Sequence, residues 1–167
     1  VPLLGLVLLV AARKREIARP VRACACASLL LVPIGVYATF IDPYRLDRAE
    51  VAQVRARAQE LGLALTVETG ALYVIDPRQK HHPSLLDPDH RERARRVDFL
   101  RRSIDLAGDL GAPIVSIWSG VSPRGERAED RAADKEGVWE RLIASLIPVL
   151  DHARSREVRL AFEPDPG

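Results

Sequence analysis

Two glutamates and a tryptophan stand where buried strands of this sequence would end. Glu68, Trp118 with Ser119, and Glu163 close or follow apolar runs that begin near residues 63, 113 and 158. In a parallel barrel the carboxyl ends of the strands meet at one rim, where barrel enzymes keep their active sites. Two carboxylates at such a rim could bind a divalent metal ion or share acid–base work. An indole ring there could form a wall against a sugar ring.

Each of these residues also has a purely structural interpretation. A glutamate at a strand end often caps a loop amide, and Trp118 could serve packing alone. His81 lies beside His82 and Lys80 in a polar loop, and adjacent histidines cannot easily face one metal ion. The loop is therefore either solvated, or its histidines grip a phosphate or carboxylate group, or His81 reaches over the rim.

Short apolar runs alternate with helical patterns from residue 36 onward. We expect Asp47 to cap the first helix, and Gly62 and Gly111 to end the first two helices, because these residue types are favoured there. The predicted strands cover 36–41, 63–67, 113–118 and 158–162, and the predicted helices cover 47–61, 89–110 and 134–154.

The last predicted helix has a wide apolar face. Residues at helical spacing are expected to point inward, and they are Val138, Trp139, Leu142, Ile143, Leu146, Val149 and Leu150. His90 and His152 fall on predicted helices, and we expect both to be exposed.

Strands of continuous apolar character that alternate with amphipathic helices indicate an α/β fold with a parallel sheet. The excess chain length lies in loops after the strands, as it does in (β/α)8 TIM barrel enzymes. A doubly wound sheet is the alternative. That fold usually carries a glycine-rich phosphate loop, and neither G-x-G-x-x-G nor G-x-x-x-x-G-K-[ST] occurs here.

Three stretches of the sequence resemble the xylose isomerase-like TIM barrels, a group often labelled sugar phosphate isomerase/epimerase. They are LTVETGALYVIDPRQKHHPSLL, FLRRSIDLAGDLGAPIVSIWSG and LIPVLDHARSREVRLAFEPDPG. The resemblance implies a partial (β/α)8 TIM barrel over residues 35–167, with roughly strands 2 to 5 and their helices.

The resemblance also implies a function and a set of site residues. The family binds a divalent metal ion such as Mn²⁺ or Mg²⁺ and moves a proton next to the carbonyl of a small sugar or polyol. Glu163, inside the phrase LAFEP, matches the metal ligand on the fifth strand, which often also acts as an acid–base group. Glu68, His81 and Trp118 match wall or substrate-binding residues.

The remaining metal ligands of the family would come from strands beyond residue 167. We therefore expect the site of this chain to be incomplete, as in the first half of an enzyme. A partial barrel also has two open sheet edges, which could lead to self-association.

Residues 1–34 do not resemble the family and are interpreted as an apolar and basic leader. Residues 23–41 carry no charge for nineteen positions, which just meets the length of a membrane span. A membrane-tethered, non-catalytic domain is therefore an alternative to a cytoplasmic enzyme. Cys24 and Cys26 lie too close for a good disulfide and make only half a zinc site.

The DNA-repair branch of the same fold, the type 2 AP endonucleases, is a further alternative. It would need histidines at strand ends and a basic groove. The four histidines lie elsewhere, and 25 basic residues nearly balance 23 acidic ones for a net charge of +2. A nucleic-acid partner is therefore not expected, and a small sugar is the predicted substrate.

Overall fold

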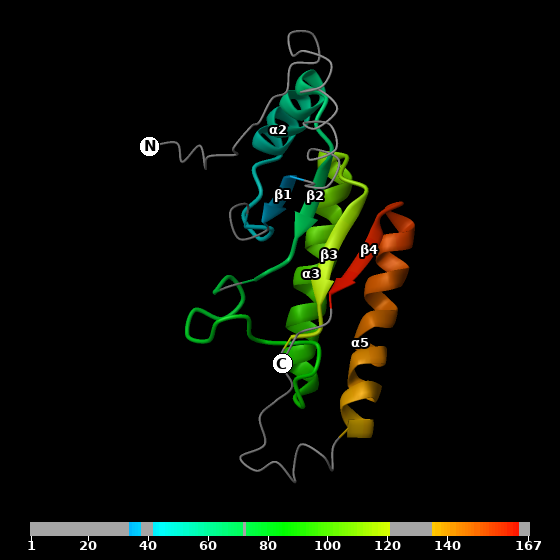
Figure 1. The fold of residues 1–167 in the computed structure, drawn as a ribbon. Coiled ribbons are helices and arrows are strands. Elements are labelled where there is room, and N and C mark those ends of the chain that lie inside the picture. The colour runs from blue at the N-terminus through cyan, green and yellow to red at the C-terminus, as the bar shows by residue number, and fades with distance from the viewer. Residues whose placement is uncertain (1–33, 38–41, 72, 121–134, 164–167) are drawn as a thin grey trace, which may run out of the picture.

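Four parallel strands form one sheet in the order in which they occur along the chain (Figure 1). The computed structural model describes residues 34–37, 42–71, 73–120 and 135–163. The strands are β1 (Ile34–Tyr37), β2 (Leu65–Glu68), β3 (Ile114–Trp118) and β4 (Arg159–Glu163). The sequential strand order β1-β2-β3-β4 is that of a barrel segment. It confirms the predicted α/β fold with a parallel sheet.

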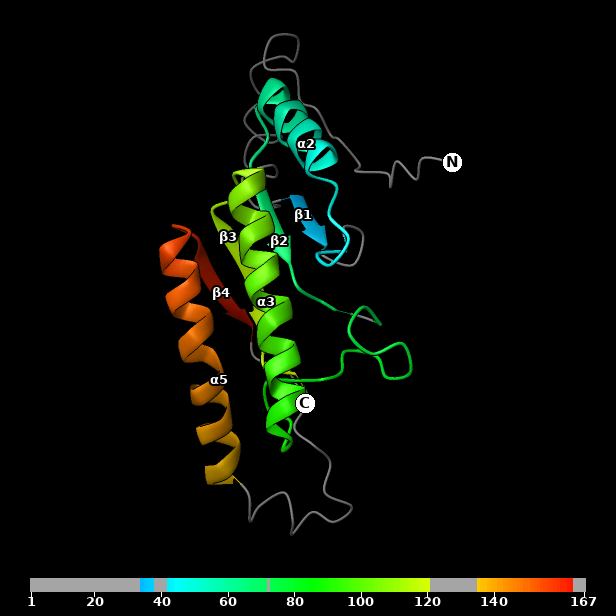
Figure 2. The same cartoon turned by 180° about the vertical axis from the view of Figure 1, so that it is seen from behind.

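Each pair of neighbouring strands is connected through a helix. The helices are α2 (Arg48–Leu61), α3 (His90–Leu110) and α5 (Lys135–Ser155). Seen from behind, α3 and α5 run side by side over the same face of the sheet (Figure 2). Helices on one face leave the other face for a barrel interior, whereas a doubly wound sheet would have helices on both faces.

Local chemistry sets the ends of the helices as predicted. The side chain of Asp47 accepts a hydrogen bond of 2.8 Å from the backbone of Ala49, at the start of α2. Gly62 and Gly111 follow α2 and α3 with positive φ angles of 65° and 73°, a conformation that favours glycine.

The core lies between the sheet and the helices. Val67 and Val115 are 0% exposed and Ile117 is 1% exposed, and they pack with apolar side chains of α3. Because successive side chains of a strand point to opposite faces, the residues that alternate with these core residues face the barrel interior. Those residues are Thr66, Glu68, Ser116 and Trp118.

The loop between β2 and α3 is fastened to the carboxyl end of β3. The backbone of Leu85 donates to the carbonyl of Ser119 at 3.1 Å, and Arg141 of α5 donates to the carbonyl of Leu86 at 3.1 Å. Gly120 has φ 82°, and a Cβ atom at this position would lie 2.5 Å from Cβ of Ser84. A glycine is therefore required where this loop crosses the end of β3.

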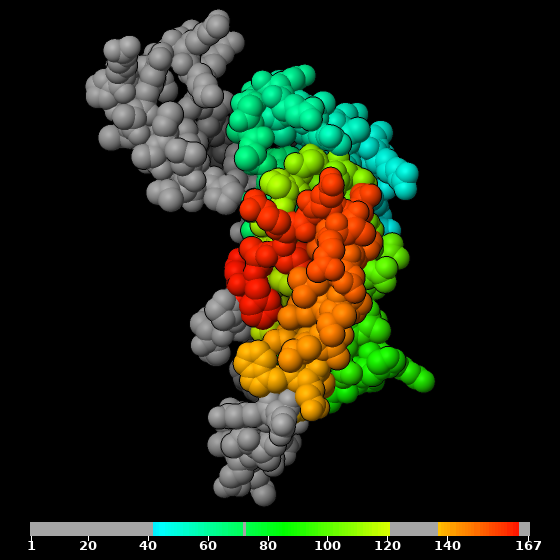
Figure 3. All heavy atoms as spheres, turned by 90° about the vertical axis from the view of Figure 1, so that its right-hand side faces the viewer, coloured from blue at the N-terminus to red at the C-terminus, as the bar shows by residue number. Residues whose placement is uncertain are grey.

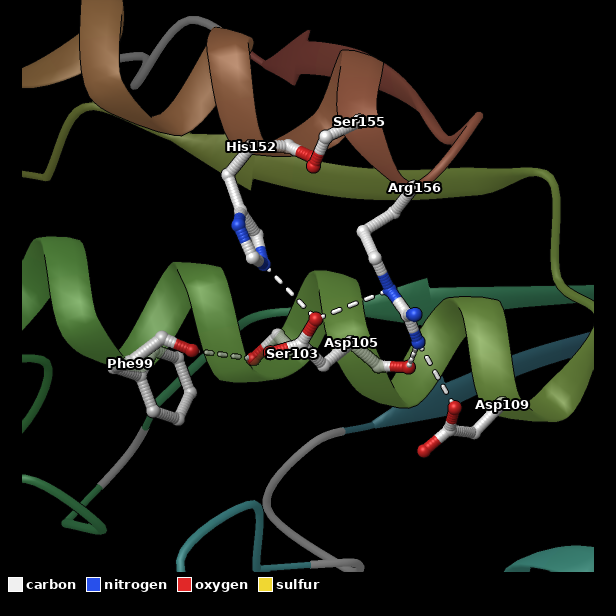
Figure 4. A network of polar contacts seen from close by, with 7 residues as sticks. All are labelled: Phe99, Ser103, Asp105, Asp109, His152, Ser155 and Arg156. Atoms are coloured by element: carbon white, nitrogen blue, oxygen red, sulfur yellow. Dashed lines mark hydrogen bonds and ion pairs between the residues drawn. The ribbon is translucent and has the colours of Figure 1, made fainter.

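A polar network joins α3 to the end of α5 (Figure 4). Asp105 accepts from His152 at 2.9 Å and pairs with Arg156 at 3.1 Å, and Arg156 also pairs with Asp109 at 2.9 Å. The prediction that His152 is exposed is wrong, because its side chain is only 18% exposed and contacts Asp105. The network lies where the helices end, away from the carboxyl ends of the strands, and fastens the helical layer.

The predicted inner face of the last helix is also partly wrong. Leu142 and Val149 are buried, but Trp139, Ile143 and Leu150 are 63%, 56% and 48% exposed. The reason is that α5 packs against α3 and β4 on one side only. The predicted first strand, 36–41, is described only up to Tyr37, and β1 begins two residues earlier than predicted, at Ile34.

The predicted leader, residues 1–34, lies outside the described residues except for Ile34. The same is true of the predicted membrane segment, residues 23–41, except for the four residues of β1. Among the helices that the structure describes, none is both long and apolar enough to cross a membrane.

Candidate functional site

Glu68, Ser116 and Glu163 meet on the face of the sheet that α3 and α5 leave uncovered. Glu68 is in register with Ser116, and Trp118 is in register with Glu163. The Ser116 hydroxyl donates a hydrogen bond to Oε1 of Glu163. The Glu163 side chain therefore lies back along the sheet, toward the level of Glu68, instead of extending past the rim.

The two carboxylates influence each other. Partial burial raises the pKa of Glu68 above its ordinary value of 4.5, contact with the Ser116 hydroxyl opposes this, and the negative charge of Glu163 raises it again. The hydroxyl has one proton and lies within reach of both carboxylates, and its hydrogen-bond geometry directs that proton to Glu163. A carboxyl group whose protonated form is favoured in this way is suited to acid–base chemistry.

A complete metal site is not found within the described ranges, where no three His, Cys, Asp or Glu side chains come together. Glu68 and Glu163 offer hard carboxylate oxygens, which suit Mg²⁺ or Mn²⁺. The described residues therefore fit part of a metal centre, and a tight site would need further oxygen or imidazole ligands.

Trp118 and His81 form an aromatic pair at the end of β3. Their ring centroids lie 4.7 Å apart with an interplanar angle of 71°, an edge-to-face contact. His81 has φ 65°, and the loop that carries it is the one fastened to Ser119 and Gly120. Since Trp118 is the register partner of Glu163, the pair stands next to the carboxylates.

Sequence reasoning missed Ser116 and placed Ser119 with the site instead. The Ser119 hydroxyl donates to the carbonyl of Gly120 and does not join the carboxylates. The available signal was the position of Ser116 inside the apolar run IVSIW, two residues before Trp118. This spacing puts Ser116 and Trp118 on the same face of a strand.

Arg96 of α3 supports the end of β2 from within the core. It is 1% exposed and donates from Nη2 to the carbonyl of Thr69 at 3.2 Å, one residue after Glu68. Burial lowers the pKa of Arg96 to about 10. Two surface hollows, of about 330 Å³ beside α2 and about 550 Å³ beside Tyr44, contain none of the predicted site residues.

The comparisons with known proteins agree with the fold. The family described as xylose isomerase-like TIM barrel matches residues 31–167. No curated protein matches the sequence. A solved D-psicose 3-epimerase with D-fructose is similar over 75% of this chain and 39% of its own length, at 21% identity and a TM-score of 0.58.

Two further solved structures show the same likeness. A D-psicose 3-epimerase with D-tagatose from Clostridium cellulolyticum H10 is covered over 46% of its length by 86% of this chain, at 19% identity and a TM-score of 0.58. A xylose isomerase domain protein from Planctomyces limnophilus is covered over 43% by 77% of this chain, at 19% identity and a TM-score of 0.53. The chain thus spans less than half the length of these three structures.

Proposed function

This chain belongs to the xylose isomerase-like TIM barrel family, and from this premise we propose that it carries part of a metal-dependent sugar isomerase or epimerase site. The reaction is the transfer of a proton at a carbon next to the carbonyl of a small sugar or polyol. The observation that carries the proposal is the convergence of Glu68, Ser116 and Glu163 on the interior face of the sheet.

Glu163 is proposed as a metal ligand and as an acid–base group. It is the last residue of β4, and one oxygen of its carboxylate accepts a hydrogen bond from Ser116. Glu68 contacts the same hydroxyl, and its pKa is raised by partial burial and by the charge of Glu163, which suits a group that accepts and returns a proton. Trp118 and His81 are proposed to form the wall against which the sugar ring packs.

A divalent metal ion such as Mn²⁺ or Mg²⁺, when bound, would polarise the sugar carbonyl and acidify the neighbouring C–H group. Within the described residues Glu163 and Glu68 would hold it, and two carboxylates alone bind weakly. We therefore propose that residues 35–167 contribute one part of the site and that the other ligands lie outside the described residues.

The proposal is tested with the purified chain and Mn²⁺, followed through the electron paramagnetic resonance signal of the free ion. We expect weak binding that Glu163→Gln abolishes, while Glu140→Gln, on the surface of α5, leaves it unchanged. With D-fructose and D-tagatose, the sugars in two of the matched structures, the chain alone should show no turnover. Equal Mn²⁺ binding by the protein and Glu163→Gln would refute the role of Glu163.

A further inference from the structure

Ser116 is a polar residue in an otherwise apolar strand. It is 5% exposed, and its neighbours Val115 and Ile117 are buried under the helices. A buried hydroxyl needs a hydrogen-bond partner, and here the partner is the carboxylate of Glu163. The serine therefore serves something other than packing, because valine or alanine would fill the position without needing a partner.

The direction of this hydrogen bond is unusual for the register of the strands. Glu163 stands opposite Trp118, whereas Ser116 stands opposite Ala161. At the rise of a β-strand, the Cα of Ser116 lies about 7 Å closer to the amino end of the sheet than the Cα of Glu163 does. Glu163 must bend back along the interior face to reach it.

Within the described residues, the bond from Ser116 is the side-chain hydrogen bond that holds Glu163. It is exposed on β4, which pairs only with β3 within the described residues. A free glutamate side chain samples many rotamers. The charge-assisted hydrogen bond to Ser116 selects the one that brings Oε1 to the Ser116 hydroxyl.

We propose that Ser116 is a positioning residue that orients the carboxylate of Glu163 toward the barrel interior. The inference rests on the proposed function of Glu163 as a metal ligand and deepens it, since Ser116 would act through the carboxylate of Glu163. Groups that hydrogen-bond to a metal ligand orient that ligand, and their loss typically weakens metal affinity by about 10-fold or more.

The test compares Ser116→Ala with Ser116→Thr, which keeps the hydroxyl, and with Ser119→Ala, which removes a hydroxyl that donates to the carbonyl of Gly120. The first readout needs no metal. In protein with ¹³C-labelled glutamate, the carboxyl signal of Glu163 is identified by its loss in Glu163→Gln. At pH 7 we expect this signal to move to the position of exposed glutamates in Ser116→Ala and to stay in place in the other two variants.

The second readout is the affinity for Mn²⁺ alone. We expect Ser116→Ala to weaken it by about 10-fold, and Ser116→Thr and Ser119→Ala to retain it. An unchanged Glu163 signal in Ser116→Ala would overturn the inference, and so would unchanged affinity when Glu163→Gln abolishes binding. If Glu163→Gln does not affect Mn²⁺, the proposed function fails, and the carboxyl signal still decides the role of Ser116.

Discussion

Arg96 shows how much a single buried charge can depend on its surroundings. The residue is 1% exposed, and its guanidinium donates to the carbonyl of Thr69, while Nε and Nη1 have no hydrogen-bond partner among the described residues. The guanidinium also lies over the ring of Phe99, 5.2 Å from Cζ to the ring centroid. Burial of a cation without a carboxylate costs several kcal/mol, so Arg96 lowers the stability of this fold.

Replacing Arg96 with methionine should therefore stabilise the chain. We expect Arg96→Met to raise the free energy of unfolding by about 1–3 kcal/mol at pH 7, measured by urea denaturation. Because the folded state binds this proton less tightly than the unfolded chain, wild-type stability should rise relative to the variant above the folded pKa of about 10.

Arg102 is the control for this prediction, since it lies on the same helix but is 47% exposed and pairs with Asp98. Arg102→Met should change the free energy of unfolding by less than about 1 kcal/mol. A loss of stability in Arg96→Met larger than in Arg102→Met would contradict the account of Arg96.

At the scale of elements, the loop between β2 and α3 matters most to the site. It carries His81 and is held by Ser119, Gly120 and α5. Its buried residues Leu85 and Leu86 are 0% and 5% exposed, so the loop is part of the core. The edge-to-face contact between His81 and Trp118 therefore involves a loop that is anchored in the core at Leu85 and Leu86.

Gly120→Ala should loosen this attachment. The added Cβ atom would lie 2.5 Å from Cβ of Ser84 at φ 82°, which combines a clash with backbone strain. We expect a loss of at least about 1–3 kcal/mol in urea denaturation, together with a change in Trp118 fluorescence, measured in a Trp139→Phe background.

Gly62→Ala separates the two contributions, because Gly62 has φ 65° and no atom within 4 Å of the added Cβ. It should cost only the backbone strain, about 1–2 kcal/mol. If both variants lose the same free energy of unfolding, the clash with Ser84 contributes nothing at Gly120 and the prediction is contradicted.

At the scale of the whole molecule, one side of the structure is unusually apolar. β4 and α5 lie next to each other on this side (Figure 3). Large exposed apolar side chains gather on these two elements, and they are Trp139, Ile143, Ile147, Leu150 and Phe162. Exposed apolar side chains favour association, and so does a strand that is paired on one side only, as β4 is within the described residues. Self-association stays a prediction.

Charges on α5 should reduce this association without unfolding the chain. Ile143 and Ile147 are each 56% exposed, so the double variant Ile143→Lys, Ile147→Lys should change stability by only about 0.5 kcal/mol per site. We expect lower apparent mass at high concentration in light scattering. Leu142→Lys, at a position only 6% exposed, should instead unfold the chain, and an unchanged mass in the double variant would contradict the prediction.

The sequence by itself determined the order of the elements and the class of the fold. Asp47, Gly62 and Gly111 mark helix ends through local backbone chemistry, and continuous apolar strands between amphipathic helices indicate a parallel sheet. These signals need only a few neighbouring residues. The resemblance of three stretches to the xylose isomerase-like barrels added the family, which the match over residues 31–167 confirms.

Only the tertiary structure decided which side chains meet. Ser116 and Glu163 are 47 positions apart, as are Asp105 and His152, and their contacts depend on strand register and helix packing. The pattern of α5 could not distinguish the side that faces α3 from the side that carries Trp139, because both are apolar. Strand register likewise decided that Ser116 and not Ser119 contacts the carboxylate of Glu163. A shift of one residue along a strand moves a side chain to the opposite face of the sheet.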